Sequence, residues 1–237
     1  MTNAVSLQLT PENRRFDVVF WDFDGTMART ENLHVAAWQR AVSHVGIPFP
    51  RHAFAAAATD DDRQLLADLF ARYQLQYDDA LIYRWCRAKQ QILVDMLRLT
   101  PVIYPGVAET VRQLASLGIE QAVVTNTWRE NVTSALAAAN LGDVIQTIID
   151  KEDVLRTKPD PEPYHIAMAR LQQPPRRCLA IEDSPTGIKS AVKAGLFVVA
   201  IAHPHSPAAR REGSWSQGAP VVSDIREIVD FLSDSGR

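Results

Sequence analysis

Two aspartates stand two residues apart, where they could hold a cation or a phosphate. Asp22 and Asp24 follow an apolar run at residues 18–21, and Gly25 comes directly after them. A run without polar residues is typical of a strand buried on both faces of a parallel sheet. Two like charges buried together are unfavourable unless a cation or a proton offsets them. These residues alone fit a metal or phosphate site and, equally, a strand that leads into an Asp-Gly turn.

Similar polar residues follow other apolar runs further along the chain. In open parallel sheets, functional groups collect beyond the carboxyl ends of the strands. Four expected strand ends supply carboxylates, an ammonium, a hydroxyl and an amide. These groups belong to Asp22, Asp24, Thr125, Asn126, Lys158, Glu182 and Asp183. Together they are able to hold a hard divalent cation and a phosphate.

The elements that position these groups alternate between strands and helices from about residue 104 onward. After the strand at 18–21, we expect strands at 120–125, 147–149, 179–181, 197–201 and 221–222. We expect helices at 107–117, 127–139, 160–171, 184–195 and 225–232. Strands that alternate with helices predict an α/β fold, a doubly wound parallel sheet with helices on both faces.

Capping residues mark the start of three of these helices. Thr127 and Glu130 have the spacing of a capping box before the second helix. Asp160 and Pro161 suit the N-cap and first helical position of the third helix, and Ser184 caps the fourth.

Residues 30–100 form a helical unit inserted after the first strand. No convincing strand occurs there, and apolar residues recur at spacings of three and four. One such face contains Ile82, Trp85, Cys86, Lys89, Ile92, Leu93 and Met96, and an earlier one contains Leu65, Leu66, Leu69, Phe70 and Tyr73. We therefore assign residues 29–100 to an all-helical cap domain, and residues 1–28 and 101–237 to the catalytic core.

Composition is ordinary for a globular protein of 237 residues, with 46% apolar and 22% charged residues. The net charge is −3 and no basic patch stands out, so we expect no nucleic-acid partner. No apolar run has the length of a membrane span, and the N-terminal residues lack a signal-peptide core, so no membrane partner is expected. Cys86 and Cys178 suit buried free thiols in a reducing, cytoplasmic environment.

The carboxylates suit Mg²⁺, which prefers oxygen ligands and usually binds one or two carboxylates plus a substrate phosphate. Asp22 and Asp183 are the expected carboxylate ligands, and the main-chain carbonyl of Asp24 is the expected third ligand. Glu182 is either a further ligand or a neighbour that supports the ligands. The expected cofactor is therefore Mg²⁺.

The remaining groups suit phosphoryl transfer, which depends mainly on positioning and charge stabilisation. Lys158 would offset carboxylate charge and hold a phosphate oxygen, while Thr125 and Asn126 would donate hydrogen bonds to that phosphate. Asp22 would be the nucleophile that forms an aspartyl-phosphate. Asp24 would protonate the leaving oxygen and then take a proton from the attacking water.

In its motifs the chain resembles the haloacid dehalogenase superfamily, in the subclass with a helical cap after the first motif. Four motifs match in order: Asp22-Phe23-Asp24-Gly25-Thr26, Thr125-Asn126, Lys158-Pro159 and Glu182-Asp183-Ser184-Pro185-Thr186-Gly187. Within the superfamily the chain is similar to the phosphoglycolate phosphatase and β-phosphoglucomutase group. The resemblance implies a Rossmann-like core, a mobile cap, magnesium and the catalytic roles given above.

The cap departs from the pattern of that group. Arg29 and Thr30 stand where relatives often carry Asp-Ser, and residues 57–60 replace a stretch that usually contains a substrate-contacting glycine. These departures concern substrate choice rather than the chemistry of the core.

Two cap residues are candidates for substrate binding. Lys89 reaches the cleft in one interpretation and extends to water from a packed stem in the other. Arg63 either contacts substrate or belongs to a solvated helix start after three aspartates. His34 and Trp38, one helical turn apart, fit hinge and core packing better than a place in the cleft.

Three classes of function remain. The leading one is a magnesium-dependent phosphatase that acts on a small phosphorylated metabolite, as a monomer or homodimer. The second is a phosphomutase of the β-phosphoglucomutase type, whose cap must exclude water from the aspartyl-phosphate. The third is a non-catalytic protein that binds a phosphorylated ligand, against which Asp22 and Asp24 both argue.

Overall fold

The computed structural model describes residues 15–43, 62–204, 208 and 214–232. Within these residues, six strands form one sheet in the order β3-β2-β1-β4-β5-β6, and each neighbouring pair is parallel. The strands are β1 (Val18–Trp21), β2 (Glu120–Val124), β3 (Thr147–Ile149), β4 (Cys178–Glu182), β5 (Phe197–Ile201) and β6 (Val221–Val222). The predicted α/β fold with a doubly wound parallel sheet is confirmed.

Strand β1 lies in the middle of the sheet, between β2 and β4. Val18 at its start pairs with Glu120 on one side and with Cys178 on the other. The chain builds the sheet outward in both directions from β1, so the strand order reverses there. Ligand crevices of open α/β sheets form at this switch point, beyond the carboxyl ends of the strands. The residues that follow β1, β2 and β4 therefore share one edge of the sheet.

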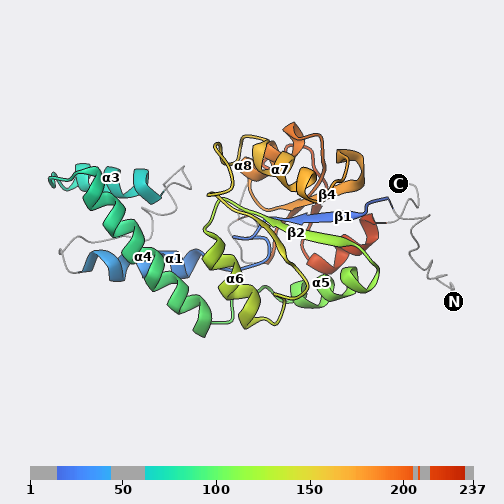
Figure 1. The fold of residues 1–237 in the computed structure, drawn as a ribbon, viewed down its shortest axis with the longest axis horizontal. Coiled ribbons are helices and arrows are strands. Elements are labelled where there is room, and N and C mark those ends of the chain that lie inside the picture. The colour runs from blue at the N-terminus through green and yellow to red at the C-terminus, as the bar shows by residue number, and fades with distance from the viewer. Residues whose placement is uncertain (1–14, 44–61, 205–207, 209–213, 233–237) are drawn as a thin grey trace.

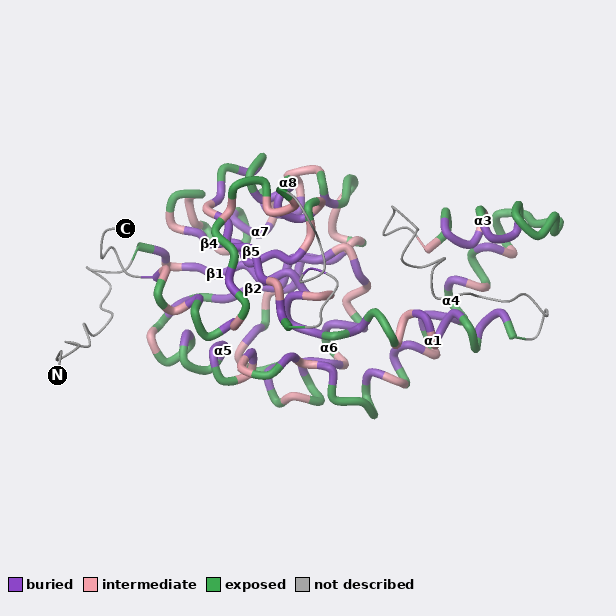
Figure 2. Tube along the Cα trace, turned by 180° about the vertical axis from the view of Figure 1, so that it is seen from behind, coloured by how far each residue is buried: buried purple, intermediate pink, exposed green. Residues whose placement is uncertain are grey.

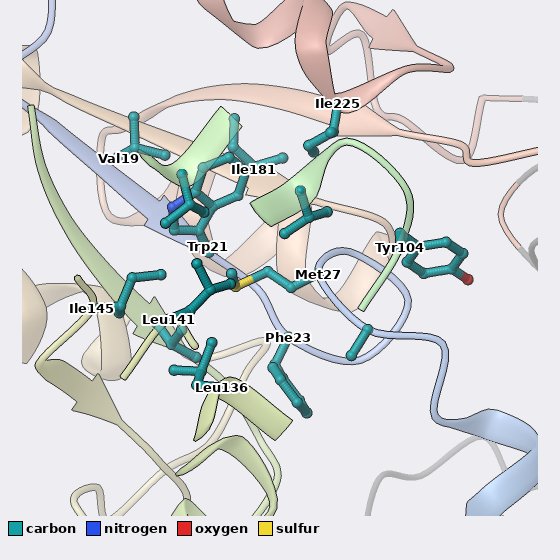
Figure 3. Close-up of a cluster of buried hydrophobic side chains, with 14 of the residues drawn as sticks. Val19, Trp21, Phe23, Met27, Tyr104, Leu136, Leu141, Ile145, Ile181 and Ile225 are labelled. Atoms are coloured by element: carbon teal, nitrogen blue, oxygen red, sulfur yellow. The ribbon is translucent and has the colours of Figure 1, made fainter. Parts of the chain in front are cut away.

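Each face of the sheet has its own apolar cluster. Val19 and Trp21 belong to one cluster and Val18 and Phe20 to the other, because successive side chains of a strand point to opposite faces. All four residues are buried, which explains why the run contains no polar residue. Figure 3 shows the first cluster, in which Trp21 and Ile181 lie together beneath the covering elements.

Helices cover both faces (Figure 1). On the face of the first cluster lie α5 (Val107–Ser116), α6 (Arg129–Ala138) and the 3-10 helix η4 (Ile225–Phe231). On the other face lie α7 (Glu162–Arg170) and α8 (Pro185–Lys193). A short 3-10 helix, η2 (Pro175–Arg177), leads into β4. The predicted closing helix is therefore present, although with 3-10 rather than α geometry.

Helix α6 begins differently from the prediction. The capping box of Thr127 and Glu130 is wrong, because Trp128 is the N-cap and its side chain makes no capping hydrogen bond. Instead, the main-chain N–H of Arg129 donates to Oδ2 of Asp150 at 2.8 Å. A residue 21 positions away thus satisfies the start of α6, and local spacing does not reveal such a partner.

Of the other two predicted caps, one is confirmed and one lies a residue away from the predicted position. Ser184 caps α8, and its hydroxyl accepts a hydrogen bond from the N–H of Gly187 at 3.0 Å. Helix α7 starts one residue later than expected, with Pro161 rather than Asp160 as the N-cap. Oδ1 of Asp160 still accepts from the N–H of Glu162 at 3.0 Å, so the aspartate supports the first turn as expected.

Three further helices, α1 (Glu31–Val42), α3 (Asp62–Arg72) and α4 (Asp79–Leu99), stand beside the sheet (Figure 1, left). They share a third apolar cluster, so the predicted helical cap is present. Tyr73, which was expected on the buried face of α3, lies past its end and is 38% exposed. The stretch at residues 57–60, which departs from the pattern of the resembled group, lies outside the described residues.

Helix α4 belongs to both the cap and the core. Ile82 and Cys86 in its first half join the cap cluster, whereas Leu93 and Leu97 in its second half join the core cluster. Figure 2 shows buried segments recurring along its length. This helix therefore fastens the cap to the core. No helix in the described part of the chain is long and apolar enough to cross a membrane.

Candidate active site

The residues predicted at the strand ends come together at one edge of the sheet. Asp22 extends β1, and its main-chain N–H donates to the carbonyl of Ile181 in β4 at 3.0 Å. Glu182 is the last residue of β4, and Asp183 follows it. Thr125 directly follows β2. The parallel register of β1, β2 and β4 therefore places these side chains side by side.

Lys158 is the cation at the centre of this group. Its Nζ donates to Oδ1 of Asp22 at 2.8 Å, to Oε1 of Glu182 at 2.6 Å and to the carbonyl of Val124 at 2.7 Å. Burial by itself lowers the pKa of Lys158, but the charges of Asp22 and Glu182 raise it above its usual value. The ammonium is thus held charged. All three of its N–H donors point to protein acceptors, so Lys158 offsets carboxylate charge, and its contact with a phosphate oxygen stays a prediction.

Asn126 holds the loop that carries Lys158. Its Oδ1 accepts from the main-chain N–H of Lys158 at 3.0 Å, and its Nδ2 donates to the carbonyl of the same residue at 3.2 Å. This pair of bonds joins the end of β2 to a residue 32 positions further on. These bonds make Asn126 a positioning residue for Lys158, and its predicted hydrogen bond to the phosphate stays a prediction. Thr125 is buried, and its Oγ1 accepts from the N–H of Thr127 at 3.1 Å.

Three carboxylates form a compact acidic group. One oxygen each from Asp22, Glu182 and Asp183 lies within 4.8 Å of the others, a spacing that a single cation can span. All three residues are less than a tenth exposed. Lys158 supplies one positive charge against three carboxylates, so the group retains negative charge for a further cation. This arrangement fits the oxygen-rich coordination that Mg²⁺ prefers.

Glu182 is fully buried, and within the described structure only one of its two carboxylate oxygens is hydrogen-bonded. Its Oε1 accepts from Lys158 and from the hydroxyl of Tyr164, while its Oε2 has no hydrogen-bond partner among the described residues. Burial raises the pKa of Glu182 to about 7, and the nearby charge of Asp22 adds to this, while Lys158 opposes it. A buried oxygen without a partner is unfavourable, and a cation beside it would remove that penalty.

Two glycines make room for these carboxylates. Gly25 has a φ of +89°, and a Cβ there would lie 2.2 Å from Oδ2 of Asp183. Gly187 is in α8, and a Cβ there would lie 1.8 Å from Oε2 of Glu182. Any side chain at either position would displace a member of the acidic group. The glycines of the first and last motifs are therefore part of the geometry of the site.

Asp24 lies apart from the acidic group and faces the cap. Its Oδ1 accepts a hydrogen bond from the hydroxyl of Thr30 and lies 3.8 Å from Nε2 of His34. Burial favours the neutral form of Asp24, but His34 and then Thr30 outweigh it and lower the pKa of the carboxyl below its usual value. Asp24 is therefore ionised in this arrangement, the form that can take a proton.

A chain of polar side chains continues from Asp24 into the cap. His34 lies between Asp24 and Lys89, with its Nδ1 3.0 Å from Nζ of Lys89. Lys89 in turn donates to Oδ2 of Asp62 at 2.9 Å, and Asp62 accepts from Nε1 of Trp38 at 3.3 Å. The alternative in which Lys89 extends to water is wrong, because Lys89 is 1% exposed. His34 and Trp38 likewise take part in this chain rather than only in packing.

The second cap candidate lies elsewhere. Arg63 is exposed in the first turn of α3, one residue after Asp62. The described structure therefore brings Lys89 next to the neighbours of Asp24 and leaves Arg63 at the surface. Its role in substrate binding stays a prediction.

Three residues around the site were missed by sequence reasoning. Tyr164 appeared only as part of a helix, yet its hydroxyl bonds Glu182. Asp62 looked like one of three acids at a helix start. His203 stacks on Tyr104 with ring centroids 3.8 Å apart, and its Nε2 lies 2.8 Å from the carbonyl of Thr26. Of the three, only Tyr164 lay inside an expected helix, and nothing in the local sequence marked Asp62 or His203.

Similarity to known proteins agrees with this geometry. A model of the family described as haloacid dehalogenase-like hydrolase matches residues 19–201. The chain belongs to this family. It is 29% identical over 213 residues to validoxylamine A 7'-phosphate phosphatase of Streptomyces hygroscopicus subsp. limoneus, covering 90% of this chain and 96% of that protein. It is 32% identical over 194 residues to protein CbbY of Rhodobacter capsulatus, covering 76% of this chain and 83% of that protein.

Solved structures of the same group have the same fold. CbbY from Rhodobacter sphaeroides, in complex with xylulose-(1,5)bisphosphate, matches with a TM-score of 0.79 and 25% identity, over 92% of this chain and 99% of that one. β-Phosphoglucomutase from Clostridium difficile matches with a TM-score of 0.75 at 20% identity, over 90% and 93% of the two chains, and supports the fold alone. These similarities confirm the predicted family and fold, and the chain is an enzyme of a hydrolase family whose named relatives include phosphatases.

Proposed function

We propose that the protein is a magnesium-dependent phosphatase that hydrolyses a small phosphorylated metabolite through an aspartyl-phosphate on Asp22. The observation that carries this proposal is that the two aspartates of the first motif have different surroundings. Asp22 lies in a buried acidic group and is bonded to Lys158, whereas Asp24 faces the cap and bonds Thr30. Family membership and the phosphatases among the relatives support the same reaction class.

The acidic group offers the ligands for the metal. Asp22 and Asp183 would hold Mg²⁺ together with the main-chain carbonyl of Asp24, and Glu182 would either join them or support them from beside. The unpartnered Oε2 of Glu182 supports a cation at this place. When bound, Mg²⁺ supplies positive charge that stabilises the phosphoryl group during transfer.

The first half of the reaction uses both aspartates. Asp24, which is ionised in the arrangement described above, first takes up a proton from solvent as the substrate binds. The carboxylate of Asp22 then attacks phosphorus, the bond from phosphorus to the ester oxygen breaks, and the leaving oxygen takes that proton from Asp24. Lys158 orients Asp22 and offsets its charge through the 2.8 Å bond to its Oδ1. Asn126 in turn keeps Lys158 in place. Thr125, buried at the end of β2, is the expected donor to the phosphate.

The second half returns the enzyme to its starting state. Asp24, now ionised, takes a proton from water, and the resulting hydroxide attacks phosphorus and releases phosphate from Asp22. Thr30 and His34 lower the pKa of Asp24 against the opposing effect of burial, which suits this step. The cap residues that contact His34, above all Lys89, connect the position of the cap to Asp24.

Release of phosphate from a panel of phosphorylated metabolites tests the proposal. We expect Asp22→Asn to lower the rate by at least roughly a thousandfold, because it removes the nucleophile. Asp95→Asn, on the exposed side of α4, removes the same charge and should retain the wild-type rate. A hexose 1-phosphate in the panel separates hydrolysis from the mutase reaction, since a mutase would yield hexose 6-phosphate.

The metal has its own test. Mg²⁺ that binds only the folded protein should raise the Tm, and Asp183→Asn should remove that shift. Enzyme stripped with EDTA should lose activity and recover it with Mg²⁺. Full activity in the stripped enzyme would contradict the role of the metal.

We also propose that the protein works in the cytoplasm, as a monomer or homodimer. Cys86 and Cys178 are both buried and form no disulfide, as expected for a reducing environment. Burial raises the pKa of the Cys178 thiol to about 12, which keeps it protonated and unreactive.

A further inference from the structure

One cation of the cap is already paired with a carboxylate. Lys89 is the only buried lysine or arginine among the described cap residues. Its Nζ donates to Oδ2 of Asp62 at 2.9 Å and lies 3.0 Å from Nδ1 of His34. An ammonium has three N–H donors, so these contacts account for two of them. The charge of Lys89 is therefore compensated before any substrate arrives.

Hydrogen bonds and neighbouring charges keep the carboxylate of Asp62 in place as the partner of Lys89. Its Oδ1 accepts from Nε1 of Trp38 at 3.3 Å, and its Oδ2 accepts from Lys89. Burial favours the neutral acid, but Lys89, followed by His34 and by Lys151 of the core, lowers the pKa of Asp62 below its usual value. Asp62 is thus ionised at neutral pH and offsets positive charge from both the cap and the core.

This ion pair lies close to the group that serves the leaving oxygen. His34 connects the two, with Nδ1 3.0 Å from Lys89 and Nε2 3.8 Å from Oδ1 of Asp24. The part of the substrate that leaves from phosphorus therefore comes near Lys89 and Asp62. A second phosphate there would meet one positive and one negative charge at similar distances, so the Coulomb energies largely cancel. Hydroxyl groups, in contrast, can donate hydrogen bonds to the carboxylate of Asp62, whose side chain is 15% exposed, whereas that of Lys89 is 1% exposed.

We propose that Asp62 determines specificity by selecting substrates whose leaving group carries hydroxyls and no second anionic group. The inference rests on the proposed phosphatase function and names its substrate class. That class is a phosphate monoester of a neutral polyol, as opposed to a bisphosphate or a phosphorylated carboxylate. Asp62 acts through Lys89, so removing the negative charge would turn the same place in the cap into a site for a second anion.

The test compares a ketose 1-phosphate with the matching ketose 1,5-bisphosphate. Wild-type kcat/KM should favour the monophosphate, and Asp62→Asn should shift the ratio by about tenfold or more toward the bisphosphate. Asparagine keeps the shape of aspartate and an oxygen acceptor for Lys89, so the helix start stays intact. Asp68→Asn is the matched control, because Asp68 lies exposed on the same helix and its side chain accepts a hydrogen bond from Gln64 of that helix.

Binding without turnover separates this inference from the proposed function. Titration calorimetry measures the affinities of the two ligands for the Asp22→Asn variant, alone and combined with Asp62→Asn. Their ratio gives the binding preference when no phosphate is released. A wild-type preference for the bisphosphate, an unchanged ratio in Asp62→Asn, or an equal shift in Asp68→Asn would each overturn the inference. Retained binding preference without any phosphate release by the wild type would overturn the phosphatase proposal alone.

Discussion

Replacing Gly187 with alanine tests directly how the acidic group is packed. Gly187 is the third residue of α8, and within a helix alanine is favoured over glycine by roughly 1 kcal/mol. A Cβ at Gly187 would, however, lie 1.8 Å from Oε2 and 2.4 Å from Oε1 of Glu182. Atoms do not approach so closely, so Glu182 would have to move. Helix propensity and packing therefore predict opposite signs for the change in stability.

The size of the effect follows from what Glu182 contacts. Its Oε1 accepts from Lys158 and Tyr164, and displacement would leave these buried donors without their acceptor. Overpacking costs about 1–3 kcal/mol, and a lost hydrogen bond to a charged group costs about 1.5–3 kcal/mol. After the gain in helix propensity we expect a net loss of roughly 2–4 kcal/mol. For a chain of this size the Tm should then fall by roughly 5–15 °C.

Scanning calorimetry measures this shift, and turnover of p-nitrophenyl phosphate measures the damage to the site. Gly142→Ala is the matched control, because a Cβ at Gly142 meets nothing within 4 Å. Its Tm should stay within about 2 °C of the wild type. A Gly187→Ala protein with full activity and a Tm at or above the wild-type value would refute the reasoning, since helix propensity alone would then decide the outcome.

Two other perturbations test the buried charges. Lys158→Met leaves the carboxylates of Asp22 and Glu182 without their cation, so the free energy of unfolding in urea should fall by about 3–5 kcal/mol. Lys193→Met, at an exposed lysine, should change it by less than about 0.5 kcal/mol, and equal losses would contradict this account. Burial lowers the pKa of His203 below its usual value, so the folded protein favours the neutral ring. Because the unfolded chain then binds more protons, stability should fall as the pH drops through about 6.5. The difference in Tm between about pH 7.5 and about pH 5.5 should be smaller in His203→Gln than in the wild type, and an equal difference would exclude this role.

Much of the fold was predictable because its signals are local. Residues 18–21 are apolar throughout, since β1 is buried on both faces between β2 and β4. Polar residues directly after such runs marked the strand ends that meet at one edge. The parallel sheet then brings residues that lie far apart in the chain to the same place, such as Asp22 and Glu182, which are 160 positions apart.

The errors arose where a partner lies far away in the chain. The start of α6 is satisfied by Asp150 and not by Thr127, because the fold brings the end of β3 to that helix. One of the two interpretations of Lys89 had it extend to water, but His34 of α1 and Asp62 of α3 contact it, and Asp62 balances its charge. Local spacing likewise did not reveal that Asn126 spans 32 residues to hold the main chain of Lys158, and its hydrogen bond to the phosphate stays a prediction. Propensity and spacing carry no information about contacts of this kind.

The sequence by itself determined the family, the sheet with its helical insertion and the set of residues at the strand ends. These depend on residue type and on periods of two and 3.6 residues, which the chain displays directly. Only the tertiary structure decided how the charges are shared. The ammonium of Lys158 is paired with the carboxylates of Asp22 and Glu182. The ammonium of Lys89 is paired with the carboxylate of Asp62. Such pairings depend on distances of a few ångströms between distant segments, because Coulomb energies in a buried site change steeply over that range.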